Sequence, residues 1–281
     1  MQPTTRPICP ATRPIFTPPR ARTLIGYAHH FEQLASHGFI VAAPDSCSVG
    51  CTDRSGGAPW TDCARGLAHD GLWGPWFGEQ LKAIEFMRNN SLHNASAPDF
   101  FRAIDWAAGV GIAGHSMGGQ ASTISAGAAC AAQWDIRAAA LIHPASGSLP
   151  SGSNSGAGMS VPTAAFTSTG DHLCSPASVA ATMQAFNASA AGQALPSLYR
   201  NVQGWSHLEP VMGVFFENPL LATFTAAWFK VFLNQEQQGT YYDLIFSGSP
   251  DSICRAEAME ECYVLPHGAG AAWDGAAQTQ E

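Results

Sequence analysis

The hydrophobic residues from position 24 onward follow two alternating patterns. Short continuous apolar runs are typical of strands buried on both faces of a parallel sheet, whereas apolar residues three or four positions apart are typical of helices. The runs predict strands at 39–43, 110–113, 138–142, 163–167 and 198–202. The spaced stretches predict helices at 27–36, 79–90, 120–132 and 220–232. This alternation predicts an α/β domain, a mostly parallel sheet flanked by helices.

The same pattern bounds one domain over 24–265. The segment 1–23 is rich in Pro, Thr and Arg and has no acidic residue, and we expect it to be unstructured. The segment 266–281 is rich in Gly and Ala, and we expect a flexible tail there.

Composition narrows the class of protein. Of the 281 residues, 46% are apolar and 12% are charged, so the chain can bury a sizeable core. The formal net charge of −8 argues against a nucleic-acid partner, because no basic face is available. No run of eighteen apolar residues occurs, so we expect no transmembrane segment. No phosphate-binding or dinucleotide-binding motif and no metal-ligand spacing occurs either; we expect a monomer without cofactor or metal.

One pentapeptide carries candidate chemistry. Gly114-His115-Ser116-Met117-Gly118 fits the G-x-S-x-G pattern of a nucleophile elbow, in which a serine stands on a tight turn between a strand and a helix. The predicted strand 110–113 precedes it and the predicted helix 120–132 follows it. Small residues at Gly114 and Gly118 allow the two backbones to approach closely. Ser116 is therefore a candidate nucleophile.

A candidate acid for Ser116 follows a later strand. Asp171 comes after the predicted strand 163–167 and is the only acidic residue between Asp135 and Glu209. Asp135 precedes the strand that follows the elbow helix, which is too early in the chain. Asp171 is therefore the candidate acid.

The candidate base is His207, which follows the predicted strand 198–202. His172 adjoins Asp171 and cannot easily turn back onto it, and His267 lies in the predicted tail. The chain order serine, aspartate, histidine is that of α/β-hydrolases. In such a triad the histidine takes the proton of the serine and the aspartate orients the imidazole. The backbone N–H of Met117 would be one oxyanion donor.

Together, these motifs resemble those of a known family. Ser36-His37-Gly38-Phe39-Ile40-Val41, Gly114–Gly119, Gly170-Asp171 and Ser206-His207 resemble the dienelactone-hydrolase-like branch of the α/β-hydrolases. This branch contains bacterial cutinases and polyester (PET) hydrolases, and chlorophyllases and platelet-activating-factor acetylhydrolases share parts of the pattern. The resemblance implies an α/β-hydrolase fold with Ser116, Asp171 and His207 as the triad.

The chain departs from that family in two places. The family has several strands before the helix that 27–36 resembles, so these strands are either missing or atypical here, and the second oxyanion donor is unaccounted for. PET hydrolases carry an aromatic residue after a proline that follows the next strand, where this chain has Ala145 after Pro144. We therefore expect a serine esterase for small or lipid-like esters. The alternative is a non-catalytic or incomplete hydrolase-fold protein that lacks a full oxyanion hole.

Two residues beside the predicted triad bear on the substrate. Met117 and Trp205 are large and apolar, and no Lys or Arg lies within several residues of the three triad members. If both side chains line the cleft, the site favours apolar esters over charged ones.

Cysteines and sequons indicate an oxidising compartment, and we expect secretion, although no signal peptide is visible. A late disulfide occurs in the resembling family, and Cys254 with Cys262 matches it. Seven residues separate the two cysteines, enough for a turn that brings their α-carbons together. The sequons are Asn89-Asn90-Ser91, Asn94-Ala95-Ser96 and Asn187-Ala188-Ser189.

Overall fold

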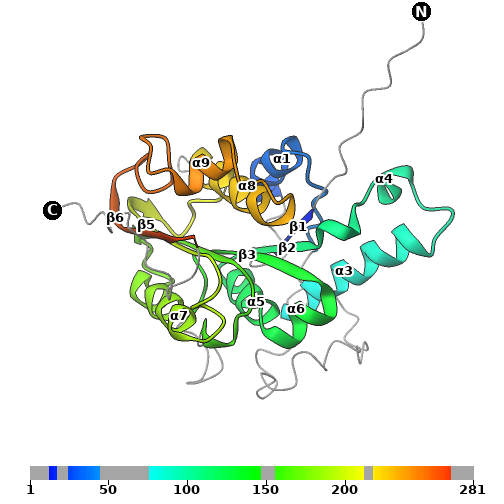
Figure 1. The fold of residues 1–281 in the computed structure, drawn as a ribbon, viewed down its shortest axis with the longest axis horizontal. Helices are drawn as coiled ribbons and strands as arrows, with labels where there is room; N and C mark the ends of the chain where they lie inside the picture. The colour runs from blue at the N-terminus through cyan, green and yellow to red at the C-terminus, as the bar shows by residue number, and fades with distance from the viewer. Residues whose placement is uncertain (1–12, 18–24, 45–75, 147–155, 212–217, 267–281) are drawn as a thin grey trace, which may run out of the picture.

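A six-stranded sheet with strand order β1-β2-β3-β4-β5-β6 forms the centre of the molecule (Figure 1). The computed structural model describes residues 13–17, 25–44, 76–146, 156–211 and 218–266. Strands β1 to β5 are parallel, and β6 is antiparallel to β5. The strands are β1 (Arg13–Thr17), β2 (Val110–His115), β3 (Ile136–Ile142), β4 (Thr163–Gly170), β5 (Ser197–Ser206) and β6 (Met259–Leu265).

Helices cover both faces of the sheet (Figure 1). Helices α1 (Ala28–Ser36), α8 (Pro219–Leu233) and α9 (Thr240–Phe246) pack on one face, and α3 (Trp76–Leu92), α5 (Met117–Ser125), α6 (Ala128–Trp134) and α7 (Pro176–Ala188) pack on the other. The short helices are η1 (Ile25–Tyr27), α4 (Asp99–Arg102), η2 (Trp106–Ala108) and η3 (Gly156–Gly158). Within the described ranges, no helix combines the length and apolarity needed to cross a membrane.

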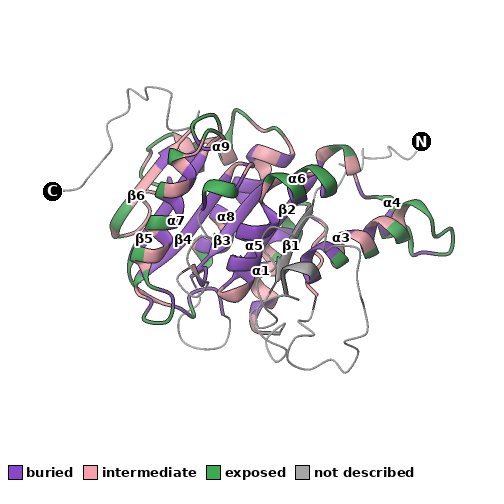
Figure 2. Ribbon diagram, turned by 90° about the horizontal axis from the view of Figure 1, so that it is seen from below, coloured by how far each residue is buried: buried purple, intermediate pink, exposed green. Residues whose placement is uncertain are grey.

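Strand β3 shows why the predicted strands read as continuous apolar runs. Ala138, Ala140 and Ile142 pack against the α8 side of the sheet. Ala139 and Leu141 pack against the α5 and α7 side. Because successive strand residues point to opposite faces and both faces are covered, the buried run 138–142 is apolar at every position. Figure 2 shows the central strands buried along their length.

Most predicted elements are confirmed within a few residues. The structure places strands over the predicted runs at 110–113, 138–142, 163–167 and 198–202. It places helices over 27–36, 79–90 and 220–232. The single helix predicted at 120–132 is two helices, because α5 ends at Ser125 and α6 begins at Ala128 after Gly127, whose extended backbone interrupts the helix.

The predicted strand at 39–43 is wrong. The segment makes only single β-bridges, at Phe39 and Ala42, and forms no continuous strand. Ile40 and Ala42 pack instead against a small apolar cluster that includes Met87 and Phe101. The apolar run therefore contacts helices α3 and α4, and an apolar sequence alone does not distinguish such packing from a buried strand.

The prediction that 1–23 is unstructured is wrong at Arg13–Thr17, which forms β1. This strand pairs in parallel with β2, and its last residue, Thr17, lies opposite Gly114. Strand β1 therefore precedes β2 in the chain and lies beside it in the sheet, although no strand was predicted there. Five residues that include Pro14 are too few to show a strand pattern, and strand pairing with β2 decides their structure. The rest of 1–23, and the predicted tail after residue 266, lie outside the described residues.

A disulfide joins Cys254 to Cys262, as predicted. Their α-carbons are 5.5 Å apart, and the bond closes a short loop between the end of α9 and strand β6. Cys254 packs against the core cluster that α8 and the sheet share. The disulfide thereby attaches β6 to the helical layer.

We expect that replacing both Cys254 and Cys262 by serine lowers the free energy of unfolding by about 2.5 kcal/mol, because a short covalent loop restricts the unfolded chain. Urea unfolding of both proteins, with and without reductant, measures the difference. Reductant should destabilise the parent protein and leave the double variant unchanged. Equal stability of the parent protein with and without reductant would contradict the prediction.

Candidate active site

Four neighbouring parallel strands each end at a residue with catalytic chemistry. Ser116 follows β2, His143 follows β3, Asp171 follows β4 and His207 follows β5. Because the carboxyl ends of parallel strands lie at one edge of the sheet, these side chains gather there. Three of the four were predicted from the sequence. His143 was not, although this residue meets the same criterion, the first position after a buried strand.

Ser116 stands on a strained turn. Its φ is +57° and its ψ is −120°, in a region that residues with a β-carbon rarely adopt. The conformation is held by hydrogen bonds from the Ser116 N–H to the Ile142 carbonyl and from the Ala145 N–H to the Ser116 carbonyl. A β-carbon on Gly114 would overlap the Gly118 carbonyl, which confirms the close approach predicted for these glycines. Backbone strain of this kind is found at functional sites.

The predicted acid and base form a hydrogen bond. The Nδ1 atom of His207 lies 2.9 Å from Oδ2 of Asp171, and both side chains are almost fully buried. Oδ1 of Asp171 accepts the N–H groups of Leu173 and Cys174 at 2.9 and 2.8 Å. Burial opposes ionisation, but the hydrogen bonds to the two histidines His143 and His207 outweigh it and hold the pKa of Asp171 well below its usual range.

His143 is a second histidine on the same carboxylate. Its Nδ1 lies 2.8 Å from Oδ2 of Asp171, and its Nε2 lies 2.9 Å from Oε2 of Glu209. Burial favours the neutral ring, but the hydrogen bonds to the two carboxylates outweigh it, and the pKa of His143 is raised. The site thus contains a histidine–aspartate–histidine arrangement.

Glu209 connects this arrangement to a buried polar network. Its Oε1 accepts hydrogen bonds from Arg200 at 3.0 Å and from the Asn218 amide at 2.7 Å. Arg200 and Asn218 also bind Glu257. Burial raises the pKa of Glu209, but the charge of Arg200 and the hydrogen bond from His143 lower it by more. The net shift is therefore downward. No local pattern in the sequence singles out Glu209, because its partners are distant in the chain.

His115, the residue before Ser116, ties the His207 turn to the end of β2. Its Nε2 lies 2.7 Å from the His207 carbonyl, and its Nδ1 lies 2.6 Å from the Tyr27 hydroxyl. A carbonyl only accepts, so Nε2 carries the proton, and Nδ1 accepts from Tyr27. Burial, with repulsion from His207 and His143, lowers the pKa of His115 far below its ordinary value, which keeps the ring neutral.

The hydroxyl of Ser116 lies beside the thiol of Cys174 and favours its ionised form. Both Ser116 and His207 are among the described residues, and these two side chains share no hydrogen bond in this structure. Burial raises the pKa of Cys174 to about 11, so the thiol stays protonated. Ser116 itself is half-buried and accessible at the start of α5.

The two residues predicted to contact substrate differ in their surroundings. Met117 is the first residue of α5 and is half-buried. Its N–H belongs to the first turn, where backbone donors have no acceptor within the helix. Trp205, near the end of β5, is also half-buried, and its indole N–H donates to Glu257 at 3.1 Å. The indole is thereby held to the polar network behind Glu209.

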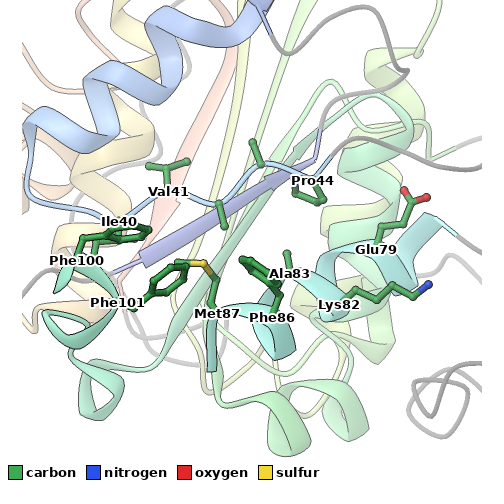
Figure 3. A pocket seen from close by; sticks show the side chains of 12 residues that line it. Ile40, Val41, Pro44, Glu79, Lys82, Ala83, Phe86, Met87, Phe100 and Phe101 are labelled. Atoms are coloured by element: carbon green, nitrogen blue, oxygen red, sulfur yellow. The ribbon is translucent and has the colours of Figure 1, made fainter. Parts of the chain in front are cut away.

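An apolar pocket of about 530 Å³ lies elsewhere in the molecule. The segment 40–44 forms one wall, and helices α3 and α4 form the others, with Met87 and Phe101 between them (Figure 3). None of the residues at the four strand ends lines it. This pocket is separate from the candidate active site.

The side-chain ligand atoms of His143, Asp171 and His207 lie within 4.8 Å of one another, as they would in a metal site. Both histidines, however, direct a nitrogen to the same oxygen of Asp171 at hydrogen-bond distance. Metal ligation would require both nitrogens to be deprotonated and to point at a common ion. Hydrogen bonding accounts for the cluster.

Comparison with models of protein families gives no match, and comparison with curated proteins gives none either. The geometry of the site is therefore the basis for its interpretation.

We expect that Tyr27→Phe lowers the free energy of unfolding by about 1–3 kcal/mol, because Nδ1 of buried His115 loses a donor. Urea unfolding measures the change. Tyr242→Phe is the matched control, since the Tyr242 hydroxyl has no hydrogen-bond partner within the described part of the chain. Equal effects of the two variants would contradict the assigned role of Tyr27.

Proposed function

We propose that this protein is a serine hydrolase that cleaves carboxylic esters through an acyl-enzyme intermediate, with Ser116 as nucleophile, His207 as base and Asp171 as the acid that orients it. The observation that carries the proposal is the left-handed backbone of Ser116 at the junction of β2 and α5. Strain at a serine in this position is characteristic of a nucleophile elbow. The Asp171–His207 hydrogen bond at the neighbouring strand ends supports it.

The tautomer of His207 suits a general base. Because Asp171 is a carboxylate that accepts from Nδ1, the proton of the neutral ring is on Nδ1 and the lone pair is on Nε2. The Ser116 hydroxyl forms a hydrogen bond with Nε2 when substrate enters, and Nε2 takes the hydroxyl proton as Oγ attacks the ester carbonyl. Catalytic hydrogen bonds commonly form only in the substrate complex.

The N–H of Met117 is the proposed oxyanion donor. It belongs to the residue directly after Ser116, at the N-terminus of a nine-residue helix, whose dipole favours negative charge. Strand β1 ends beside the elbow strand, with Thr17 opposite Gly114. The sheet therefore continues beyond β2 to a strand on the side of the elbow away from β3.

We further propose membership of the dienelactone-hydrolase-like branch, on the motifs described above. The position at which PET hydrolases carry an aromatic residue holds Ala145, which is buried and donates its N–H to the Ser116 carbonyl. A small buried side chain offers no surface on which an aromatic polymer ring can stack. Small or lipid-like esters fit this site better than aromatic polyesters.

We expect the purified protein to hydrolyse short-chain p-nitrophenyl esters and Ser116→Ala to lose at least about a thousandfold in kcat/KM, because the nucleophile is removed. A fluorophosphonate probe should label Ser116, identified by peptide mapping. Ser122→Ala, a buried serine of the same helix, is the matched control and should keep both activities. Labelling at another serine, or equal rates for Ser116→Ala and the parent protein, would contradict the proposal.

Apolar residues lie next to the proposed triad members along the chain. Leu173, two residues after Asp171, is 76% exposed, and Leu208, directly after His207, is 41% exposed. Met117 follows Ser116 and is half-buried. Exposed leucines beside reacting groups suit contact with apolar substrate groups. The cation Arg200 lies behind the site, where Glu209 and Glu257 bind it.

We expect kcat/KM for a butyrate ester to exceed that for the succinate monoester of the same alcohol by about tenfold or more, because a charged group loses hydration without gaining a partner. Steady-state kinetics with both esters measures the ratio. Replacing Leu173 and Leu208 by serine should lower the rate with butyrate and narrow the ratio. Equal values for the two esters in the parent protein would contradict an apolar site.

A further inference from the structure

His143 has an unusual backbone conformation. It was not predicted as a site residue from the sequence. Its φ is +43°, and it directly follows strand β3. Its N–H donates to the Phe166 carbonyl at 2.8 Å, and its ring is fully buried. Left-handed backbone at a residue with a β-carbon is retained only when surrounding contacts enforce it. Strands β2 and β3 therefore both end in strained residues, Ser116 and His143.

The hydrogen bonds of His143 define its protonation. Both ring nitrogens face a carboxylate oxygen, at 2.8 and 2.9 Å. A neutral imidazole has one N–H, so one contact would direct a lone pair at a carboxylate oxygen. Either the ring carries two protons or one carboxylate carries one.

The other partners of the two carboxylates decide between these possibilities. Oδ1 of Asp171 accepts two backbone N–H groups, and its Oδ2 faces Nδ1 of both histidines, so four donors are available to the ionised carboxylate and favour that form. Glu209 accepts from Arg200 and Asn218 at one oxygen and from His143 at the other. Both carboxylates are therefore ionised, and His143 is an imidazolium. Two fully buried carboxylates then face two fully buried cations, His143 and Arg200.

We propose that His143 is a positioning residue of the proposed hydrolase, an imidazolium between Asp171 and Glu209 that holds the Asp171 carboxylate toward His207 and sets the pH range in which His207 acts as a base. This inference rests on the proposed function for its kinetic part only. The protonation of His143 follows from the hydrogen bonds and is open to test in a protein of any activity.

The direction of the effect follows from charge. The centroid of the His143 ring lies 5.7 Å from that of His207, and both bind the same oxygen of Asp171. A cation at His143 opposes a second cation at His207 and draws on the same carboxylate. The remaining groups that face His143 are Glu209, with Arg200 behind it, and the neutral ring of His115, whose centroid is 5.9 Å away. Removing the cation therefore stabilises protonated His207.

Ring nitrogen NMR of histidine-labelled protein tests the protonation directly. We expect one histidine, whose signals are absent in His143→Asn, to keep both ring nitrogens protonated at about pH 8.5, where ordinary histidines are neutral. Asparagine is chosen because it tolerates positive φ. In Glu209→Gln the same signals should lose a proton at lower pH. A neutral His143 ring at that pH in the parent protein, or unchanged titration in Glu209→Gln, would overturn the inference.

The kinetic test is the pH profile of kcat/KM for a p-nitrophenyl ester. In His143→Asn the acidic limb should move to higher pH by about one unit, whereas a merely structural role would lower activity at every pH alike. His172→Gln, an exposed histidine beside Asp171, is the matched control and should leave the limb in place. An unmoved limb in folded His143→Asn would overturn the role toward His207. Absence of ester hydrolysis by the parent protein would refute the proposed function, while the NMR result still decides the state of His143.

Discussion

An ionised carboxylate in the interior is the constraint on which the candidate site depends. Asp171 is fully buried, and a buried carboxylate is stable only if hydrogen bonds and nearby cations replace its hydration. Two backbone N–H groups after β4 and two histidines supply them. The Asp171 carboxylate is thus stabilised by the turn after β4, by His143 with its strained backbone and by His207.

The parallel sheet makes such a convergence possible. Because β2 to β5 are adjacent and parallel, their carboxyl ends present four consecutive chain segments at one edge. The helices on both faces fix the strands and leave this edge to the connecting turns. The close contact at Gly114 and Gly118 then forces Ser116 outward, and His115 ties the turn of His207 back to β2. The site is thus assembled from turns, while the sheet determines where each turn begins.

The network behind the proposed triad extends the same electrostatic balance. Asp171 and Glu209 are joined by His143, and Glu209 is joined to Arg200, whose other partner is Glu257 at the edge of the interior. Alternating charges allow each buried ion to have an opposite neighbour, and removing one leaves another uncompensated. A substitution at Glu209 or Arg200 therefore alters the electrostatic environment of Asp171, although neither residue forms a hydrogen bond with it.

The sequence by itself determined the α/β class, four of the five parallel strands, the positions of the main helices and the residues Ser116, Asp171 and His207. Hydrophobic runs, turn glycines and residues that follow strands depend on local chemistry, which is readable along the chain. Only the tertiary structure decided that Arg13–Thr17 is a strand, that 39–43 packs on helices, and that His143, Glu209 and Tyr27 belong to the site. Strand pairing and buried charge pairs join residues that are distant in the chain, so no local pattern encodes them.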